Sequence, residues 1–150
     1  TYENENVAEG WLEVVDVADP AAPRVVGGWR HPRAGDAFSS DLGLFGYGAH
    51  NPTTTAHLAL VSWYRAGLIV FDLSDPAHPT PLATFAPSDA AATGLGLWGR
   101  VAFVSYPIIK DGLIYVLDGR NGLYVLRYTG PYHDELDGVR FLEGNSNRGS

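Results

Sequence analysis

The clearest evidence for the fold lies in residues 67–79, which read Gly67-Leu68-Ile69-Val70-Phe71-Asp72-Leu73-Ser74-Asp75-Pro76-Ala77-His78-Pro79. The apolar part has the length and the β-branched and aromatic content of a strand. The Asp-Pro-x-x-Pro part that follows is a turn, because proline presets φ and aspartate accepts a hydrogen bond from the backbone two residues on. These residues therefore predict a strand, a chemically specified corner and the start of a second strand.

The same pattern occurs elsewhere in the chain. Residues 11–23 repeat it up to the Asp-Pro-x-x-Pro corner, with Ala18 in place of Ser74. Downstream, Ser62 recurs as Ser105, 43 positions later, and Gly67 recurs as Gly112, 45 positions later. A period of about 40 to 50 residues is typical of the four-stranded blade of a β-propeller.

The strand-like runs are apolar at nearly every position instead of alternating. Besides 12–17 and 68–73 they are 58–64, 101–106, 113–118 and 122–128. Continuous apolar runs predict strands covered on both faces by stacked sheets. The 18 glycines and 10 prolines make long helices scarce.

The predicted fold class is therefore all-β: a β-propeller fragment of roughly two and a half four-stranded blades plus a C-terminal tail. We place the partial propeller in residues 1–131 and a partly disordered tail in 132–150, with an exposed rim loop over 31–46. The predicted units are a half-blade at 11–29 (strands 12–17 and 24–29), a blade at 47–87 (47–51, 58–64, 68–73 and 81–85) and a blade at 95–128 (96–98, 101–106, 113–118 and 122–128).

A propeller closes with about four to eight blades, so this chain does not close alone. The expected partners are the remaining blades of the same propeller, in a longer precursor or a companion fragment, or other copies of the chain. The start at Thr1 without a methionine favours the longer precursor.

Composition excludes several functions. The formal net charge is −7, which disfavours nucleic acid and anionic membrane surfaces as partners. No apolar run approaches the roughly 18 to 20 residues of a membrane span. The absence of cysteine excludes disulfide frameworks, cysteine-ligated metal and thiol catalysis.

Residues 67–79 resemble the repeat of the LVIVD-repeat β-propeller family, in which an apolar strand ends in aspartate before Ser-Asp-Pro-x-x-Pro. Residues 11–23 are similar, and 122–131 look like the last strand of such proteins in bacteria. The resemblance implies a propeller and, since many such proteins are exported, a secreted or cell-surface location. It implies no catalytic motif.

His50-Asn51 is the most site-like pair, because it falls on the strand expected to line the propeller channel. In that position His50 would ligate a metal ion or hold an anion. A metal ion is the only cofactor that the sequence suggests. The alternative is that His50 bonds the backbone of a neighbouring blade. The equivalent place in the next blade holds Trp98, expected in the core or the channel lining.

A second set of candidates falls at the end of the second strand of each blade: Trp63, Tyr64, Arg65 and the matching Tyr106. Exposed there, aromatic rings with arginine would bind a sugar or a peptide by stacking and cation–π contact. The alternative is packing between blades. His31 and His78 are expected to be exposed turn residues, and residues 133–135 a solvated acidic stretch.

Two functions follow from these residues. The first is a non-enzymatic scaffold or binding module that presents rim loops and a central channel to a protein or glycan partner. The second is a channel-centred metalloenzyme or oxidoreductase in which His50 joins ligands from other blades. We favour the first, because the sequence contains no convergent set of acid, base and nucleophile and the aspartates recur once per blade.

Overall fold

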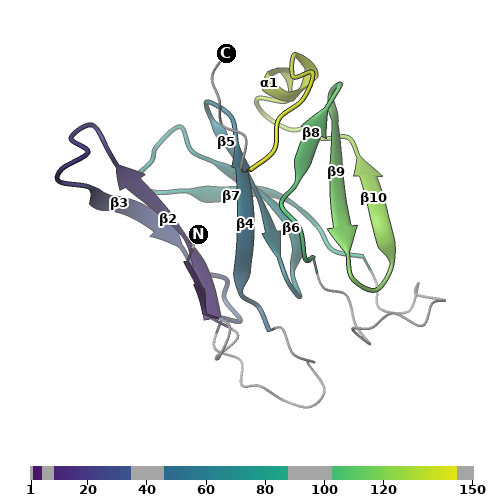
Figure 1. Ribbon diagram of the computed structural model, residues 1–150, viewed down its shortest axis with the longest axis horizontal. Helices are drawn as coiled ribbons and strands as arrows, with labels where there is room; N and C mark the ends of the chain where they lie inside the picture. The colour runs from purple at the N-terminus through teal and green to yellow at the C-terminus, as the bar shows by residue number, and fades with distance from the viewer. Residues whose placement is uncertain (1, 5–8, 35–45, 88–102, 145–150) are drawn as a thin grey trace.

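The computed structural model describes residues 2–4, 9–34, 46–87 and 103–144. Three antiparallel sheets and one short helix occupy these ranges (Figure 1). The first sheet has the order β1-β2-β3, the second β4-β5-β6-β7 and the third β10-β9-β8. The all-β class is confirmed, and the sheets are consistent with propeller blades, although the described residues form no closed ring.

The second sheet lies between the other two (Figure 1). Its strands are β4 (Ala49–Thr54), β5 (Leu58–Trp63), β6 (Gly67–Asp72) and β7 (Thr80–Phe85). Each of the four strands predicted over 47–85 has its counterpart here, and each strand pairs with the next along the chain. This is the up-and-down order of a single blade.

Strands β5 and β6, in the middle of this central sheet, are buried on both faces, which explains their continuous apolar runs. Leu60 and Val70 face the third sheet, where they pack in one core with Ile114 and Val116. The alternate residues Val61, Trp63, Ile69 and Phe71 face the first sheet and share a second core with Leu12. Successive side chains of a strand point to opposite faces, so a strand buried on both sides needs apolar residues at every position.

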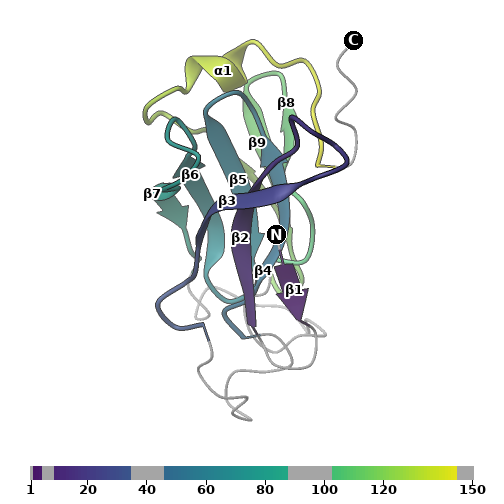
Figure 2. The same cartoon turned by 90° about the vertical axis from the view of Figure 1, so that its left-hand side faces the viewer.

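The first sheet contains β2 (Glu9–Asp16) and β3 (Arg24–Trp29), close to the two strands predicted for the half-blade. A third strand, β1 (Tyr2–Asn4), pairs with β2 and was not predicted. Figure 2 views the molecule from this side and shows β2 and β3 in front of the central sheet.

The third sheet corrects one predicted strand. It consists of β8 (Ile108–Lys110), β9 (Leu113–Asp118) and β10 (Gly122–Leu126). Of the strand expected at 101–106, the described part shows a single bridge, from Phe103 to Asp118, and regular pairing resumes only at β8. Pro107 has no N–H to donate to a ladder, which interrupts the strand. The strand expected at 96–98 and most of the loop at 31–46 lie outside the described residues.

The β8–β9 connection explains why β8 forms where it does. Asp111 and Gly112 both have positive φ, 50° and 73°, as a two-residue hairpin turn requires. Lys110 therefore pairs directly with Leu113. The residues inserted into the repeat between Ser105 and Gly112 therefore include strand β8.

The repeated aspartates are strand-end caps. The side chains of Asp16, Asp72 and Asp118 each accept a hydrogen bond from the backbone N–H two residues on, at 2.9, 2.7 and 3.1 Å. At the corners, Asp19 and Asp75 do the same at 3.0 Å. The recurrence of these residues reflects the same turn made again in each unit.

The last described residues pack on one end of the fold. Helix α1 (Asp134–Asp137) lies at the same end as the β4–β5 and β8–β9 turns (Figures 1 and 2). Beyond it, Leu142 forms a two-hydrogen-bond bridge with Ile109 of β8. The segment 139–142 is therefore joined to the third sheet at Leu142.

In the part of the chain that the structure describes, no helix combines the length and apolar character required to cross a bilayer.

Candidate functional site

His50 lies on β4, an edge strand of the central sheet. Its Nε2 is 3.2 Å from the carbonyl oxygen of Val104, and its Nδ1 is 3.1 Å from the hydroxyl of Tyr64. The imidazole also stacks on the Tyr64 ring, with the centroids 4.9 Å apart. His50 therefore joins its own sheet to the backbone of the next one, which is the structural alternative that its position suggested.

The contacts of His50 occupy both ring nitrogens. In one tautomer Nε2–H donates to Val104 and Nδ1 accepts from the hydroxyl of Tyr64, and in the other Nε2 accepts from the Asn51 amide and Nδ1–H donates to that hydroxyl. The amide nitrogen of Asn51 lies 3.2 Å from Nε2 as well. Metal ligation needs a lone pair directed at the metal, and no group of three or more His, Asp or Glu side chains suited to a metal occurs in the described ranges. A metal at His50 thus gains no support from the geometry.

The rim residues of the second strand are less exposed than expected. Trp63 is fully buried and donates its indole N–H to the carbonyl of Tyr47 at 2.5 Å, and Tyr64 is 8% exposed. These two rings therefore show the alternative of packing within the fold: Trp63 lies in the core shared with the first sheet, and Tyr64 stacks on His50. Arg65, in the β5–β6 turn, is half-buried and lines a pocket.

Tyr106 lies in the interrupted strand before β8 and is half-buried. A hydrogen bond to the carboxylate of Glu143, together with the negative charge of that group, raises the pKa of Tyr106. This ties the rim to the C-terminal segment. Trp98, the remaining candidate, lies outside the described residues.

The environment of His31 differs from the one predicted from the sequence. Instead of standing exposed beside Pro32, it is half-buried and stacks on Tyr47, with ring centroids 4.9 Å apart and planes at 13°. Tyr47 is 16 positions away in the sequence. Only the packing of the first sheet on the central sheet brings the two rings together.

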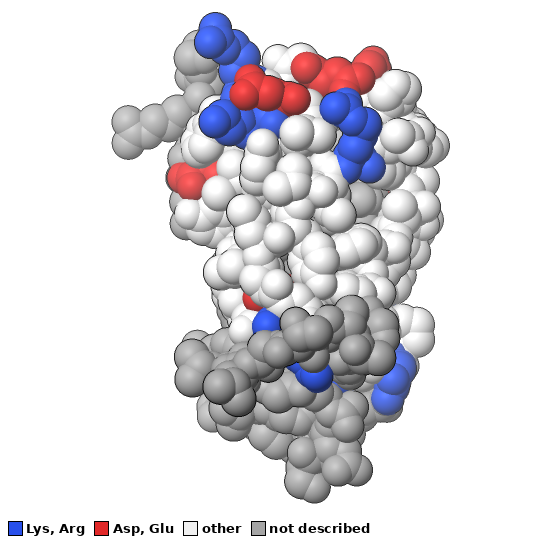
Figure 3. Space-filling model, turned by 90° about the vertical axis from the view of Figure 1, so that its right-hand side faces the viewer, with Lys and Arg blue, Asp and Glu red and all other residues white. Residues whose placement is uncertain are grey.

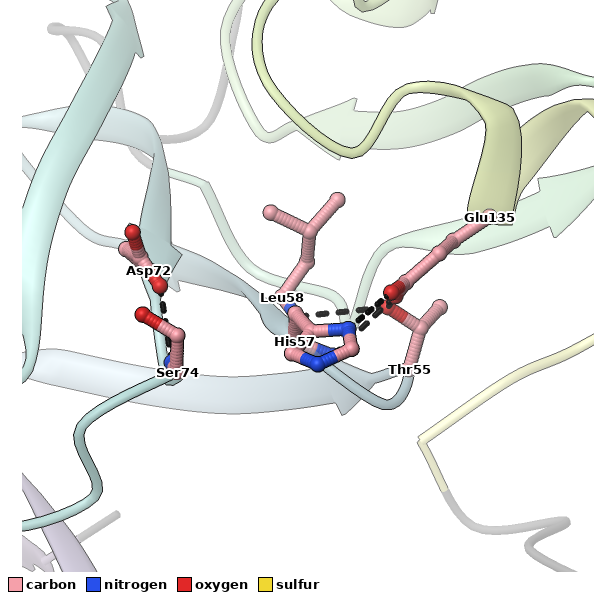
Figure 4. A network of polar contacts seen from close by, with 6 residues as sticks. All are labelled: Thr55, His57, Leu58, Asp72, Ser74 and Glu135. Carbon is pink, nitrogen blue, oxygen red and sulfur yellow. Dashed lines mark hydrogen bonds and ion pairs between the residues drawn. The ribbon is translucent and has the colours of Figure 1, made fainter.

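A second missed group is the network around Glu135 (Figure 4). From helix α1, the Glu135 carboxylate accepts hydrogen bonds from the Thr55 hydroxyl at 2.5 Å, from the backbone N–H of His57 at 3.0 Å and from His57 Nδ1. The acidic stretch expected to be solvated therefore fastens the C-terminal helix to the β4–β5 turn. The other face of the network is an aromatic stack of His57 on Tyr132.

Electrostatics in this network follow from the contacts. Burial raises the pKa of Glu135, but the hydrogen bonds from Thr55 and His57 outweigh that effect and the net pKa is lowered. Nearby, the hydroxyl and N–H of Ser74 hold the pKa of Asp72 below its ordinary value, with His57 adding a smaller effect. Both carboxylates are thus stabilised as acceptors that organise turns (Figure 4).

These features define an all-β repeat protein assembled from antiparallel sheets of the propeller-blade type, with aspartate-capped turns that recur from unit to unit. Residues 59–85, which span β5, β6 and β7, match the family model of the LVIVD repeat. The central blade therefore carries an LVIVD repeat, as its strand and Asp-Pro corner predicted. Comparison with curated proteins and with solved structures gave no match.

Proposed function

We propose that the chain is a non-enzymatic scaffold and binding module whose sheets form part of a larger β-propeller. The polar clusters described above each act as a structural contact: His50 joins two sheets, and Glu135 fastens a helix. The rim then serves as the surface for a protein or glycan partner. The single observation that carries this proposal is the apolar character of the outer faces of both end sheets.

The outer face of the first sheet exposes a cross-strand apolar pair. Val15 and Val25 are register partners and are 42% and 62% exposed. Val15 points away from the central sheet, because the buried Leu12 of the same strand points toward it. These are side chains that a neighbouring sheet would cover.

The third sheet has the same arrangement at the opposite end of the stack. Leu117 and Leu123 are register partners, 42% and 61% exposed, and Val125 beside them is 51% exposed. Figure 3 views this end and shows a broad uncharged surface on the described residues, with charged groups above and below it. An apolar surface bordered by polar groups is typical of an interaction site.

The central sheet indicates what covers such faces. It buries its own apolar residues on both sides against neighbouring sheets, so the open outer faces of the first and third sheets fit further blades of the same kind. A chain with an open apolar face at each end of the stack associates head to tail, because the outer face of the first sheet in one copy packs against the outer face of the third sheet in the next copy.

The test is the mass of the native protein, measured by light scattering. The variants Val25→Lys and Leu123→Lys place a charge on the two apolar faces, and Thr80→Lys, at an exposed strand position, is the control. We expect the protein to exceed the monomer mass at micromolar concentration, each variant in an apolar face to lower that mass, and Thr80→Lys to leave it unchanged. A folded monomer at all concentrations, unaffected by any variant, would overturn the proposal.

A further inference from the structure

The third sheet repeats the first three strands of the central sheet at a constant spacing of 55 residues. Pro52 of β4 recurs as Pro107 beside β8, and Gly67 at the start of β6 recurs as Gly122 at the start of β10. The two glycines have nearly the same backbone angle, φ 88° and 87°. The β4–β5 and β8–β9 turns also lie at the same end of the fold (Figures 1 and 2). The structural counterpart of Gly67 is therefore Gly122, and not Gly112 as the sequence repeat suggested.

Among the described residues, the fourth strand of the central sheet has no counterpart in the third sheet. After β6 the chain turns the Asp-Pro corner and adds β7 to the outer edge of β6. After β10 it forms α1 instead and returns to β8, at the opposite edge of the sheet, where Leu142 bridges Ile109. In the part of the chain that the structure describes, β10 therefore pairs with β9 alone, and Figure 1 shows it as the outermost strand of its sheet.

The backbone groups that β10 directs outward follow from the pairing of β9. The carbonyl of Leu117 accepts a hydrogen bond from the N–H of Val104 at 3.1 Å, so Leu117 directs its polar groups toward the segment that leads into β8. In an antiparallel ladder this direction alternates along each strand, and directly opposite residues either bond to each other or both point away. Leu123 is the register partner of Leu117. It therefore directs its N–H and C=O to the open edge, as does Val125 two positions on.

The side chains of these two residues are uncovered as well. Leu123 and Val125 are 61% and 51% exposed, whereas their counterparts in β6, Leu68 and Val70, are 2% and 4% exposed. On the face toward the central sheet, a cavity of about 160 Å³ lies between β7 and the end of β10. Outward N–H and C=O groups beside apolar side chains make a sheet edge a template for the addition of a further strand.

We propose that β10 takes up an extended, alternately apolar segment of a partner chain as an antiparallel fourth strand, in the way that β6 takes up β7. In the central sheet, Phe85 of β7 lies opposite Leu68. The incoming strand accordingly sets an apolar side chain opposite Leu123, the counterpart of Leu68. Its source is the chain whose blade covers the third sheet, and in this respect the inference rests on the proposed function.

The test is the fluorescence anisotropy of a labelled peptide with the sequence of residues 79–87, which contain β7. Ala83 is the register partner of Val70, so its N–H points toward β6 in the chain and would bond to β10 in the peptide. N-methylation at Ala83 should weaken binding at least about tenfold. The matched control is N-methylation at Thr84, whose N–H points away, and it should leave binding unchanged.

Variants place the peptide on β10. Val125→Pro removes an outward N–H without removing a bond to β9 and should abolish binding. Val25→Lys, which tests the stacking of the first sheet, should leave peptide binding unchanged, and a peptide bound by a chain that stays monomeric would support edge pairing and count against the proposed function. Absence of binding up to about 1 mM peptide, or equal effects of the two N-methylated peptides, would overturn the inference even if Val125→Pro perturbs folding.

Discussion

Replacing Glu135 by glutamine tests whether the C-terminal helix is fastened by charge. The carboxylate accepts three hydrogen bonds, from the Thr55 hydroxyl and from the backbone and ring N–H groups of His57, and its side chain is 19% exposed. A hydrogen bond to a charged group contributes about 0.5 kcal/mol or more beyond a neutral one. Three such bonds predict a loss of about 1.5 kcal/mol, or about 3 to 6 °C in Tm for a protein of this size.

The assay is urea denaturation at pH 7 and at a series of lower pH values. Because the native pKa of Glu135 lies below its ordinary value of 4.5, its stabilising contribution is present above about pH 4.5 and is lost as the pH falls through the native pKa. The difference between the protein and Glu135→Gln should therefore shrink in acid.

The control for this measurement is Asp134→Asn, which removes the same charge from an exposed position of the same helix. It should change the free energy of unfolding by no more than about 0.5 kcal/mol. If Glu135→Gln costs no more than Asp134→Asn at pH 7, or if its cost does not decrease in acid, the fastening role is refuted.

Four further variants test the packing and a turn cap. Gly67 has φ +88°, and a Cβ there would lie 2.1 Å from the carbonyl oxygen of Phe85. Gly67→Ala should therefore lower the free energy of unfolding by at least about 2 kcal/mol. At Gly138 a Cβ meets nothing within 4 Å, so Gly138→Ala should leave the stability unchanged or raise it slightly. The buried hydroxyl of Tyr128 has no hydrogen-bond partner in the described structure, so Tyr128→Phe should leave the Tm unchanged or raise it; a clear fall in Tm would show a missed partner. Asp72→Ala should lower the Tm at pH 7 but not below its lowered native pKa, and an equal effect at pH 2 and pH 7 would argue against the turn-capping role.

Local chemistry was readable from the sequence wherever the residues that interact are neighbours in the chain. The Asp-Pro corner at residues 75–79 and the aspartate caps at the strand ends depend on contacts across two or three positions. Uninterrupted apolar runs also revealed that the strands of the central sheet are covered on both faces. The break at Pro107 escaped because the apolar run continues through it.

The candidate site was only partly predictable. His50, Asn51 and Tyr64 were each singled out, but the stack of His50 on Tyr64 and the bond to Val104 depend on how β4, β5 and the next sheet meet. Trp63 has the residue type of a binding rim, yet the packing of two sheets decides that it is buried.

The sequence by itself determined the repeat, most of the strands and the aspartate-capped turns, because these follow from propensity and from hydrogen bonds between residues close in the chain. The tertiary structure alone decided that Glu135 reaches Thr55, 80 positions away, and that His31 meets Tyr47 beside Arg65. Such contacts depend on how complete sheets stack. The sequence of one strand does not predict which side chains of a distant segment will contact it.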